Sequence, residues 1–208
     1  MPATLDAPHL FALAAALGWA SGLRFYLVVF LTGLAGALGW VALPDGLRVL
    51  QHPLVLGASG LLVLIEFGAD KIPAVDSVWD LVHTFVRIPG GAALAAAAFG
   101  ADRPAVMLAA ALLGGTLAAA SHATKATTRA AVNTSPEPFS NLGLSLLGDA
   151  LVPLALWLAH AHPYAFFGAL AAALLVMAAL LWVFARFLVA LVRRLGRAFG
   201  GAPAAGAR

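Results

Sequence analysis

Long stretches without a charged residue dominate this chain and constrain its fold most strongly. Asp, Glu, Lys and Arg are all missing from six segments, residues 7–23, 25–44, 49–65, 88–101, 104–124 and 150–185. Segments of this length approach or exceed the roughly 20 apolar residues that a membrane-spanning helix needs. The pattern therefore predicts an all-α, polytopic bundle of transmembrane helices.

Composition supports the same class. Hydrophobic residues make up 62% of the 208 residues and charged residues only 10%, whereas a soluble domain has about 25% charged residues. A soluble globular domain is therefore excluded. At this length we expect one integral membrane domain, residues 1–199, followed by a flexible tail, residues 200–208. The chain contains no cysteine, which excludes disulfides, thiolate metal ligands and cysteine nucleophiles.

The positive charge is concentrated at the C-terminus. The formal net charge is +3, and arginines lie at positions 186, 193, 194, 197 and 208. Such clusters favour the cytoplasmic side of a membrane, so we expect a multi-pass protein of the inner (plasma) membrane with a cytoplasmic C-terminus. The lipid bilayer is then the main partner, and no nucleic acid is expected. The side of the N-terminus stays open, as does a homo-oligomer, which the glycine- and alanine-rich faces would permit.

Prolines and glycines divide the apolar sequence into about six helical elements. Residues 10–42 would form a helix of roughly 50 Å if straight, longer than the ~30 Å hydrocarbon core, so we expect a break near Ser21, Gly22 and Arg24. Further helices are expected at 53–71, 75–87, 105–133, 139–160 and 164–197. The third is expected to be interrupted at Pro89, Gly90 and Gly91. Each broken segment is either a full crossing or a re-entrant pair.

Two parts of the chain are similar to each other in sequence. Residues 66–70 and 145–149 end in an aspartate with a proline shortly after, and each is preceded by a segment with a single arginine, Arg24 or Arg129, among small or hydroxyl residues. Internal, inverted repeats with broken helices are typical of transporters. Chance similarity within a low-complexity apolar sequence is the alternative.

Ionisable residues recur at helical spacing within these apolar segments, where charge is costly and therefore marks candidate functional positions. Asp76, Asp80, His83 and Arg87 follow one another at i, i+4, i+7 and i+11, which confines them to an arc of roughly 60° on one helix face. Glu66 and Asp70 share a face of the preceding helix in the same way.

Two further polar stripes lie on other predicted helices, and one of them is basic, opposite in character to the stripe that contains Asp76 and Asp80. His122, Lys125, Arg129 and Asn133 fall within an arc of roughly 80°, and Asn141, Ser145 and Asp149 are each four residues apart. Across the core, five acids (Glu66, Asp70, Asp76, Asp80, Asp149) face five bases (Arg24, Lys71, Arg87, Lys125, Arg129). Such a balance is what burial demands, because a lone buried charge is far more costly than a paired one.

Two interpretations of the stripes remain open. They could belong to an amphipathic helix that lies at the membrane interface, with Trp79 and His83 among the lipid headgroups. The ion pairs would then only fix the helix register. Alternatively, they line a shared, hydrated cavity with titratable acids and two histidines. The occurrence of polar stripes on several separate elements favours the cavity.

Motifs of common enzymes are missing. The sequence has no glycine-rich phosphate loop, no His-Glu-x-x-His and no Gly-x-Ser-x-Gly, so an enzyme is not expected. No cofactor is expected either. Carboxylates suit hard cations, so a divalent ion, if any binds, would be held by Glu66, Asp70, Asp76 and Asp80.

One stretch carries a family resemblance. Residues 66–91, EFGADKIPAVDSVWDLVHTFVRIPGG, resemble the signature of a bacterial membrane family catalogued as domain of unknown function four-one-two-six. Residues 22–24 (GLR) and 122–129 (HATKATTR) resemble the same family, so the likeness covers most of residues 10–185. The resemblance implies a multi-helix integral membrane protein and brings no established activity.

These observations favour a small transporter or ion permease with a proton- or cation-linked mechanism and a small solute or ion as its ligand. A carboxylate among Asp70, Asp76 and Asp80 would carry the proton or cation, while Arg24 and Arg129 hold an anionic group or neutralise the empty site. The candidate cavity residues are Glu66, Asp70, Asp76, Asp80, His83, Arg87, Arg24, His122, Lys125, Arg129, Asn141 and Asp149. A membrane scaffold or lipid-binding protein with a structural charge network is the alternative, and a metal-dependent enzyme of lipid phosphates a minor one.

Overall fold

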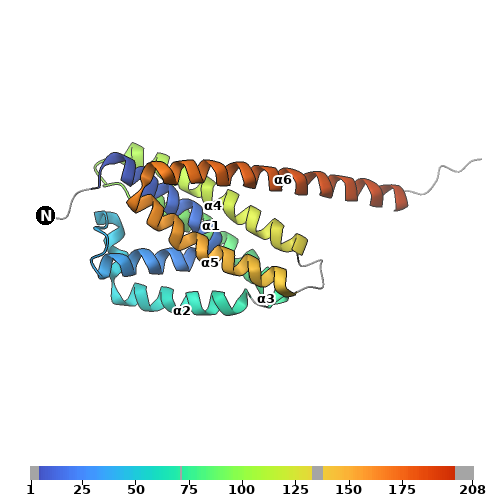
Figure 1. Cartoon of the computed structure of the whole chain (residues 1–208), viewed down its shortest axis with the longest axis horizontal. Coiled ribbons are helices and arrows are strands. Elements are labelled where there is room, and N and C mark those ends of the chain that lie inside the picture. The colour runs from blue at the N-terminus through green and yellow to red at the C-terminus, as the bar shows by residue number, and fades with distance from the viewer. Residues whose placement is uncertain (1–4, 71, 133–137, 200–208) are drawn as a thin grey trace, which may run out of the picture.

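The computed structural model describes residues 5–70, 72–132 and 138–199, and all regular structure in these ranges is helical (Figure 1). The elements are α1 (Ala7–Ala37), the 3₁₀ helix η1 (Asp45–Gln51), α2 (Pro53–Ala69), α3 (Pro73–Ala97), α4 (Pro104–Val132), α5 (Pro138–Ala161) and α6 (Pro163–Phe199). By length and composition α1, α4, Leu142–Ala161 of α5 and Pro163–Arg197 of α6 could each span a membrane. The bent pair of η1 and α2, at 69°, adds a fifth candidate. The predicted all-α membrane bundle is therefore confirmed.

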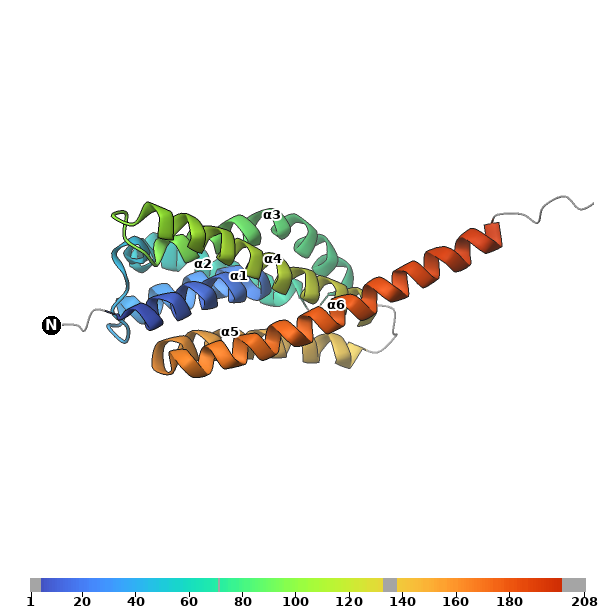
Figure 2. The ribbon, with the colours of Figure 1, turned by 90° about the horizontal axis from the view of Figure 1, so that it is seen from above.

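The predicted break in the first apolar segment lies at Arg24. This residue alone within α1 has non-helical backbone angles, φ −149° and ψ 82°. As a straight helix α1 would be about 46 Å long, yet Asp6 and His9 at its start line the same cleft as Gly36 and Gly39 at its end. The second half of α1 therefore runs back beside the first, as both views show (Figures 1 and 2). The result is a helical hairpin with Arg24 at its tip.

The third helix differs from its prediction. Instead of ending at Pro89, α3 continues to Ala97 with Pro89 inside it. Membrane helices tolerate an internal proline where neighbouring helices support the freed backbone groups. Here the following glycines supply close packing, since a Cβ on Gly90 would lie 2.3 Å from the ring of Phe25 and one on Gly91 2.8 Å from Ala118 Cβ. The expected interruption at these residues was wrong.

Small residues bring α1, α3 and α4 together at the centre of the bundle. A Cβ added to Gly18 of α1 would lie 2.6 Å from Gly114 Cα of α4, and one added to Gly114 would lie 2.3 Å from Ala95 Cβ of α3. Backbones can approach this closely only where side chains are small. This packing fixes the helix faces that carry the polar stripes.

The outer surface is apolar. Large hydrophobic side chains such as Leu54, Phe85 and Leu175 are mostly exposed, as expected for helices that face acyl chains. Helix α6 contributes little to the core, and its C-terminal part extends well beyond the other helices (Figure 2). The expected tail at residues 200–208 lies outside the described residues.

Candidate functional site

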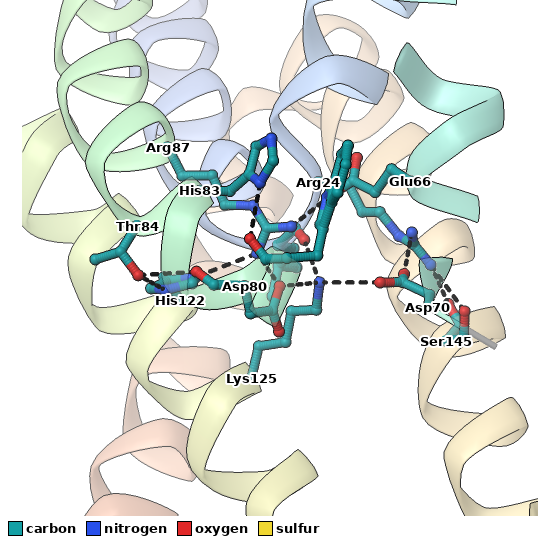
Figure 3. A network of polar contacts seen from close by, with 12 residues as sticks. Arg24, Glu66, Asp70, Asp80, His83, Thr84, Arg87, His122, Lys125 and Ser145 are labelled. Atoms are coloured by element: carbon teal, nitrogen blue, oxygen red, sulfur yellow. Dashed lines mark hydrogen bonds and ion pairs between the residues drawn. The ribbon is translucent and has the colours of Figure 1, made fainter. Parts of the chain in front are cut away.

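Arg24, at the tip of the α1 hairpin, joins three helices. Its side chain is only 3% exposed; Nη1 forms an ion pair with Asp70, and Nε lies 2.8 Å from Asp149 Oδ1. Its Nη2 donates to Ser145 Oγ at 2.9 Å and lies 3.3 Å from the Ser145 carbonyl oxygen. The backbone break thus directs one guanidinium toward the end of α2 and the first half of α5 (Figure 3).

A second buried guanidinium belongs to Arg87 of α3. Its Nη2 donates to Glu66 Oε1 at 2.5 Å and its Nη1 to Asp80 Oδ1 at 2.6 Å, and all three side chains are less than a tenth exposed. The contact with Glu66 ties α3 to α2, and the contact with Asp80, on α3 itself, fixes the orientation of the guanidinium. Since burying a carboxylate without a partner costs several kcal/mol, both acids depend on this arginine.

Two basic residues of α4 connect these clusters. Lys125 Nζ lies 3.2 Å from Asp80 Oδ1 and 3.9 Å from Asp70 Oδ1, and it donates to the Leu23 carbonyl oxygen at 3.2 Å. Arg129 approaches Asp70 at 3.4 Å. Lys125 therefore bridges the Arg24 and Arg87 clusters into one network (Figure 3).

The described network is electrically balanced. Four acids and four bases belong to it: Glu66, Asp70, Asp80 and Asp149 against Arg24, Arg87, Lys125 and Arg129. Asp70 is fully buried and meets three of the four bases. It is the carboxylate on which the most positive charge converges.

The two histidines flank the network in different ways. His122 Nδ1 lies 3.3 Å from Arg87 Nη1, and its Nε2 lies 2.7 Å from Thr84 Oγ1. A guanidinium can only donate, so Nδ1 accepts and Nε2 carries the proton that it donates to Thr84. His83 instead hydrogen-bonds the Trp79 carbonyl oxygen through Nδ1 at 2.7 Å and stacks on the Trp79 ring. Among the contacts of the described side chains, His122 is the histidine that touches a charged member of the network.

Most of the predicted site residues come together. Arg24, Glu66, Asp70, Asp80, Arg87, Lys125, Arg129 and Asp149 form the network, with His122 in contact and His83 at its edge. Asp76 lies on α3 and Asn141 on α5, but their side chains are outside the described part of the chain, as are Lys71 and Asn133 entirely. The described charges are buried between helices, which does not fit a helix lying at the membrane interface.

Several hydroxyl groups at the site were not singled out from the sequence. Ser145, noted only as part of a stripe, accepts from Arg24, and Thr84 lies four residues after Asp80, whose carbonyl oxygen accepts its hydrogen bond at 2.9 Å. Helical spacing to an ionisable residue was the available signal for both. Ser121, which donates to the Trp19 carbonyl oxygen at 2.7 Å across the α1–α4 contact, carried the same signal, because it lies four residues before Lys125.

A cavity of about 300 Å³ adjoins the network between α1, α4, α5 and α6. We call it the basic cavity, because its polar lining consists of three bases and four hydroxyl residues: Arg24, Lys125, Arg129, Ser121, Thr124, Thr128 and Ser145. None of the described residues that line it is acidic. The remaining walls are apolar and come mostly from α5 and α6. Most of the cavity surface is apolar and can receive hydrocarbon, and the three bases contribute a small polar area that can receive one anionic group.

The acids of the network face bases rather than one another. Within the described part of the chain, no group of three or more His, Cys, Asp or Glu side chains is placed to hold a metal ion. Glu66, Asp70 and Asp80 each direct an oxygen toward a guanidinium. A divalent cation at these residues and Asp76 stays a prediction.

Comparison with known families agrees with this architecture. The family described as Domain of unknown function (DUF4126) matches residues 11–184. The chain belongs to this family. The match covers α1 through most of α6 and includes every member of the charge network. No curated protein and no solved structure matches this DUF4126 member.

Proposed function

We propose that this DUF4126 protein is a transporter, and not an enzyme, that moves an anionic solute across the membrane together with a proton. One observation carries the proposal: the three bases that line the basic cavity, Arg24, Lys125 and Arg129, are the same three that surround Asp70. A solute anion in the cavity and the Asp70 carboxylate would therefore compete for one set of positive charges.

This competition supplies a coupling mechanism. With the cavity empty, ionised Asp70 neutralises the bases, which keeps the buried charge balanced. When an anion enters and takes over Arg24 or Arg129, the carboxylate loses its partners, and a proton on Asp70 restores the balance. Anion and proton then occupy the site together and leave it together. Of the two expected proton carriers whose side chains the structure describes, Asp70 and Asp80, Asp70 is the one whose ion-pair partners all border the cavity.

Proteoliposomes test the coupling. Purified protein would be reconstituted with a pH-sensitive dye inside, and inorganic phosphate or a lysophosphatidate, a single-chain phosphate lipid, would be added outside. We expect internal acidification that depends on the added anion and is lost in Asp70→Asn. Asp102→Asn is the matched control, because Asp102 lies on an exposed loop with a side chain 76% exposed. Acidification that survives in a folded Asp70→Asn variant would contradict the proposed role of Asp70.

A structural scaffold is the second candidate, and the completeness of pairing at Arg87 favours it. Both acids of that cluster already face the guanidinium at hydrogen-bond distance, an arrangement that could serve only to hold helices together. A scaffold predicts that neutralising Asp70 lowers yield and thermal stability, and that no anion drives proton entry. A stable Asp70→Asn protein that has lost anion-dependent acidification would support transport over a scaffold.

A further inference from the structure

A second, wholly apolar space adjoins the basic cavity. Nine residues of α1, α5 and α6 line this smaller space of about 110 Å³, which we call the apolar arm. Trp19, Leu151 and Ala173 line both spaces. The two therefore adjoin, with positive charge and hydroxyl groups confined to one end of the combined volume.

The apolar part follows the α5–α6 pair for much of its length. Along α5 the lining runs from Leu144 in the basic cavity to Leu158 in the apolar arm, which corresponds to roughly 20 Å at the rise of an α-helix. The arm holds only about 110 Å³, a volume that suits part of one hydrocarbon chain rather than two chains. A small inorganic ion would leave all of this length unused.

The combined cavity is also accessible from the membrane side. Its lining includes Leu147, Val176 and Leu180, which are 53%, 59% and 44% exposed on the apolar surface of the bundle. Residues on this surface face acyl chains when the protein is in a bilayer. An amphiphile could therefore enter sideways, with its chain remaining in hydrocarbon while its headgroup reaches the bases.

From these features we propose that the ligand of the basic cavity is a single-chain anionic amphiphile, with a carboxylate or phosphate headgroup at Arg24, Lys125 and Arg129 and its chain in the apolar arm. That this amphiphile is the transported solute rests on the proposed transport function, whereas its binding to the cavity does not. Charged hydrogen bonds to the guanidinium groups hold the headgroup, and the apolar arm keeps the chain out of water while the headgroup is bound.

Trp19 provides a direct readout. Its ring borders both spaces and its Nε1 lies 3.3 Å from Met177 Sδ, so a bound chain that carries bromine would quench its fluorescence. Lysophosphatidate with a dibrominated chain is the probe, and dibrominated oleate is the second arm that separates a phosphate from a carboxylate headgroup. We expect saturable quenching in wild-type protein in detergent, and loss of the saturable component in Trp19→Phe.

Competition separates the two halves of the ligand. Unlabelled lysophosphatidate should displace the probe, whereas glycerol 3-phosphate, which lacks the chain, and monooleoylglycerol, which lacks the charge, should each require at least tenfold higher concentrations. Equal competition by either one would overturn the inference. Displacement by two-chain phosphatidate as effective as by lysophosphatidate would also overturn the single-chain assignment.

A matched pair of substitutions tests the location without touching the charge network. Ala173→Phe would fill the junction of the two spaces, and Ala172→Phe adds the same ring on the exposed face of α6. We expect at least tenfold weaker probe binding in the first variant and unchanged binding in the second; equal binding in both would overturn the site. Probe binding without anion-dependent acidification would refute the transport function and leave the ligand assignment standing. Phosphate-driven acidification without probe binding would refute the ligand assignment and leave the transport function standing.

Discussion

Arg87 is the side chain whose removal should cost this fold most. It is 1% exposed and lies between Glu66 and Asp80 at 2.5 and 2.6 Å. Arg87→Gln would leave two buried carboxylates short of a partner, and we expect it to lower the free energy of unfolding by about 3–5 kcal/mol. Thermal unfolding or urea titration in detergent would measure the loss.

A double substitution distinguishes pairing from simple loss of packing. In Glu66→Gln/Arg87→Gln one uncompensated charge disappears, and Asp80 keeps Lys125 at 3.2 Å. Residues in contact couple by up to about 3 kcal/mol, so the double variant should be more stable than the sum of the two single losses predicts. Strict additivity would show that the ion pair contributes nothing beyond volume.

Ser145 offers a milder test at the other arginine. Its hydroxyl is buried and accepts from Arg24 Nη2 at 2.9 Å. Hydrogen bonds to charged groups contribute about 1.5–3 kcal/mol, and because the Ser145 carbonyl oxygen also contacts Arg24, we expect Ser145→Ala to cost an amount near the lower end of this range. Ser140→Ala, on an exposed part of the same helix, should leave the unfolding midpoint unchanged.

At this scale the sequence revealed which side chains share a helix face but not which faces meet. Asp80 and Arg87 are seven residues apart on one helix, so their proximity follows from the helical repeat alone. The contact of Lys125 with both Asp80 and Asp70 depends on how α4 packs against α2 and α3, and no local pattern encodes that. The basic cavity was likewise invisible, because it arises from residues on four separate helices.

Between elements, close backbone approach at Gly22 carries the most specific prediction. A Cβ there would lie 2.0 Å from Ser121 Oγ and 2.2 Å from the Ala118 carbonyl oxygen, so Gly22→Ala must separate α1 from α4. Overpacking of this kind costs about 1–3 kcal/mol. Gly57→Ala in α2 is the control, since a Cβ there meets nothing within 4 Å and alanine favours the helix. Equal unfolding midpoints for the two variants would contradict the tight α1–α4 contact.

The helices were predictable where the length of an apolar segment and the positions of its prolines indicated the same boundaries. Prolines mark the starts of α2, α4, α5 and α6, and the excess length of the first apolar segment predicted the break that lies at Arg24. The sequence could not settle whether that break makes a kink or a hairpin, because this depends on the backbone angles of one residue. Pro89 misled the prediction because neighbouring helices in a membrane bundle can satisfy the backbone groups that an internal proline frees. The helix η1 was missed because a single short 3₁₀ helix has no periodic pattern.

For the whole molecule, the two similar segments converge on one site. Asp70 and Asp149, which end the two segments, both contact Arg24, and Arg129 also approaches Asp70. Arg24 precedes the first of the two similar segments and Arg129 precedes the second, and both arginines contact Asp70, the aspartate of the first segment. A duplicated unit folded around a common centre would give this arrangement. The inverted repeat stays a prediction, and the shared contacts at Asp70 indicate where the two halves of such a repeat would meet.

The distribution of charge along the bundle predicts its orientation in the membrane. At one end η1 and the α3–α4 loop carry Arg48 and Arg103, each beside an aspartate, Asp45 at 3.0 Å and Asp102 at 3.7 Å. The opposite end carries the part of α6 that projects beyond the bundle (Figure 2), with arginines at 186, 193, 194 and 197. Because α6 would be roughly 55 Å long against a hydrocarbon core of ~30 Å, we expect its arginine-rich end to leave the membrane, and the positive-inside rule predicts that this end lies in the cytoplasm.

Reporter fusions test this orientation directly. Green fluorescent protein fused to the C-terminus should be fluorescent and alkaline phosphatase fused there inactive, since the first matures in the cytoplasm and the second outside it. Figure 1 shows the start of α1 at the end of the bundle opposite the projecting part of α6, so fusions to the N-terminus should behave in the reverse way. Replacing Arg193, Arg194 and Arg197 by Gln should produce a mixed population, while Arg48→Gln/Arg103→Gln should not. A C-terminal phosphatase that is active in the unmodified chain would reverse the orientation and place the basic end of α6 outside the cell.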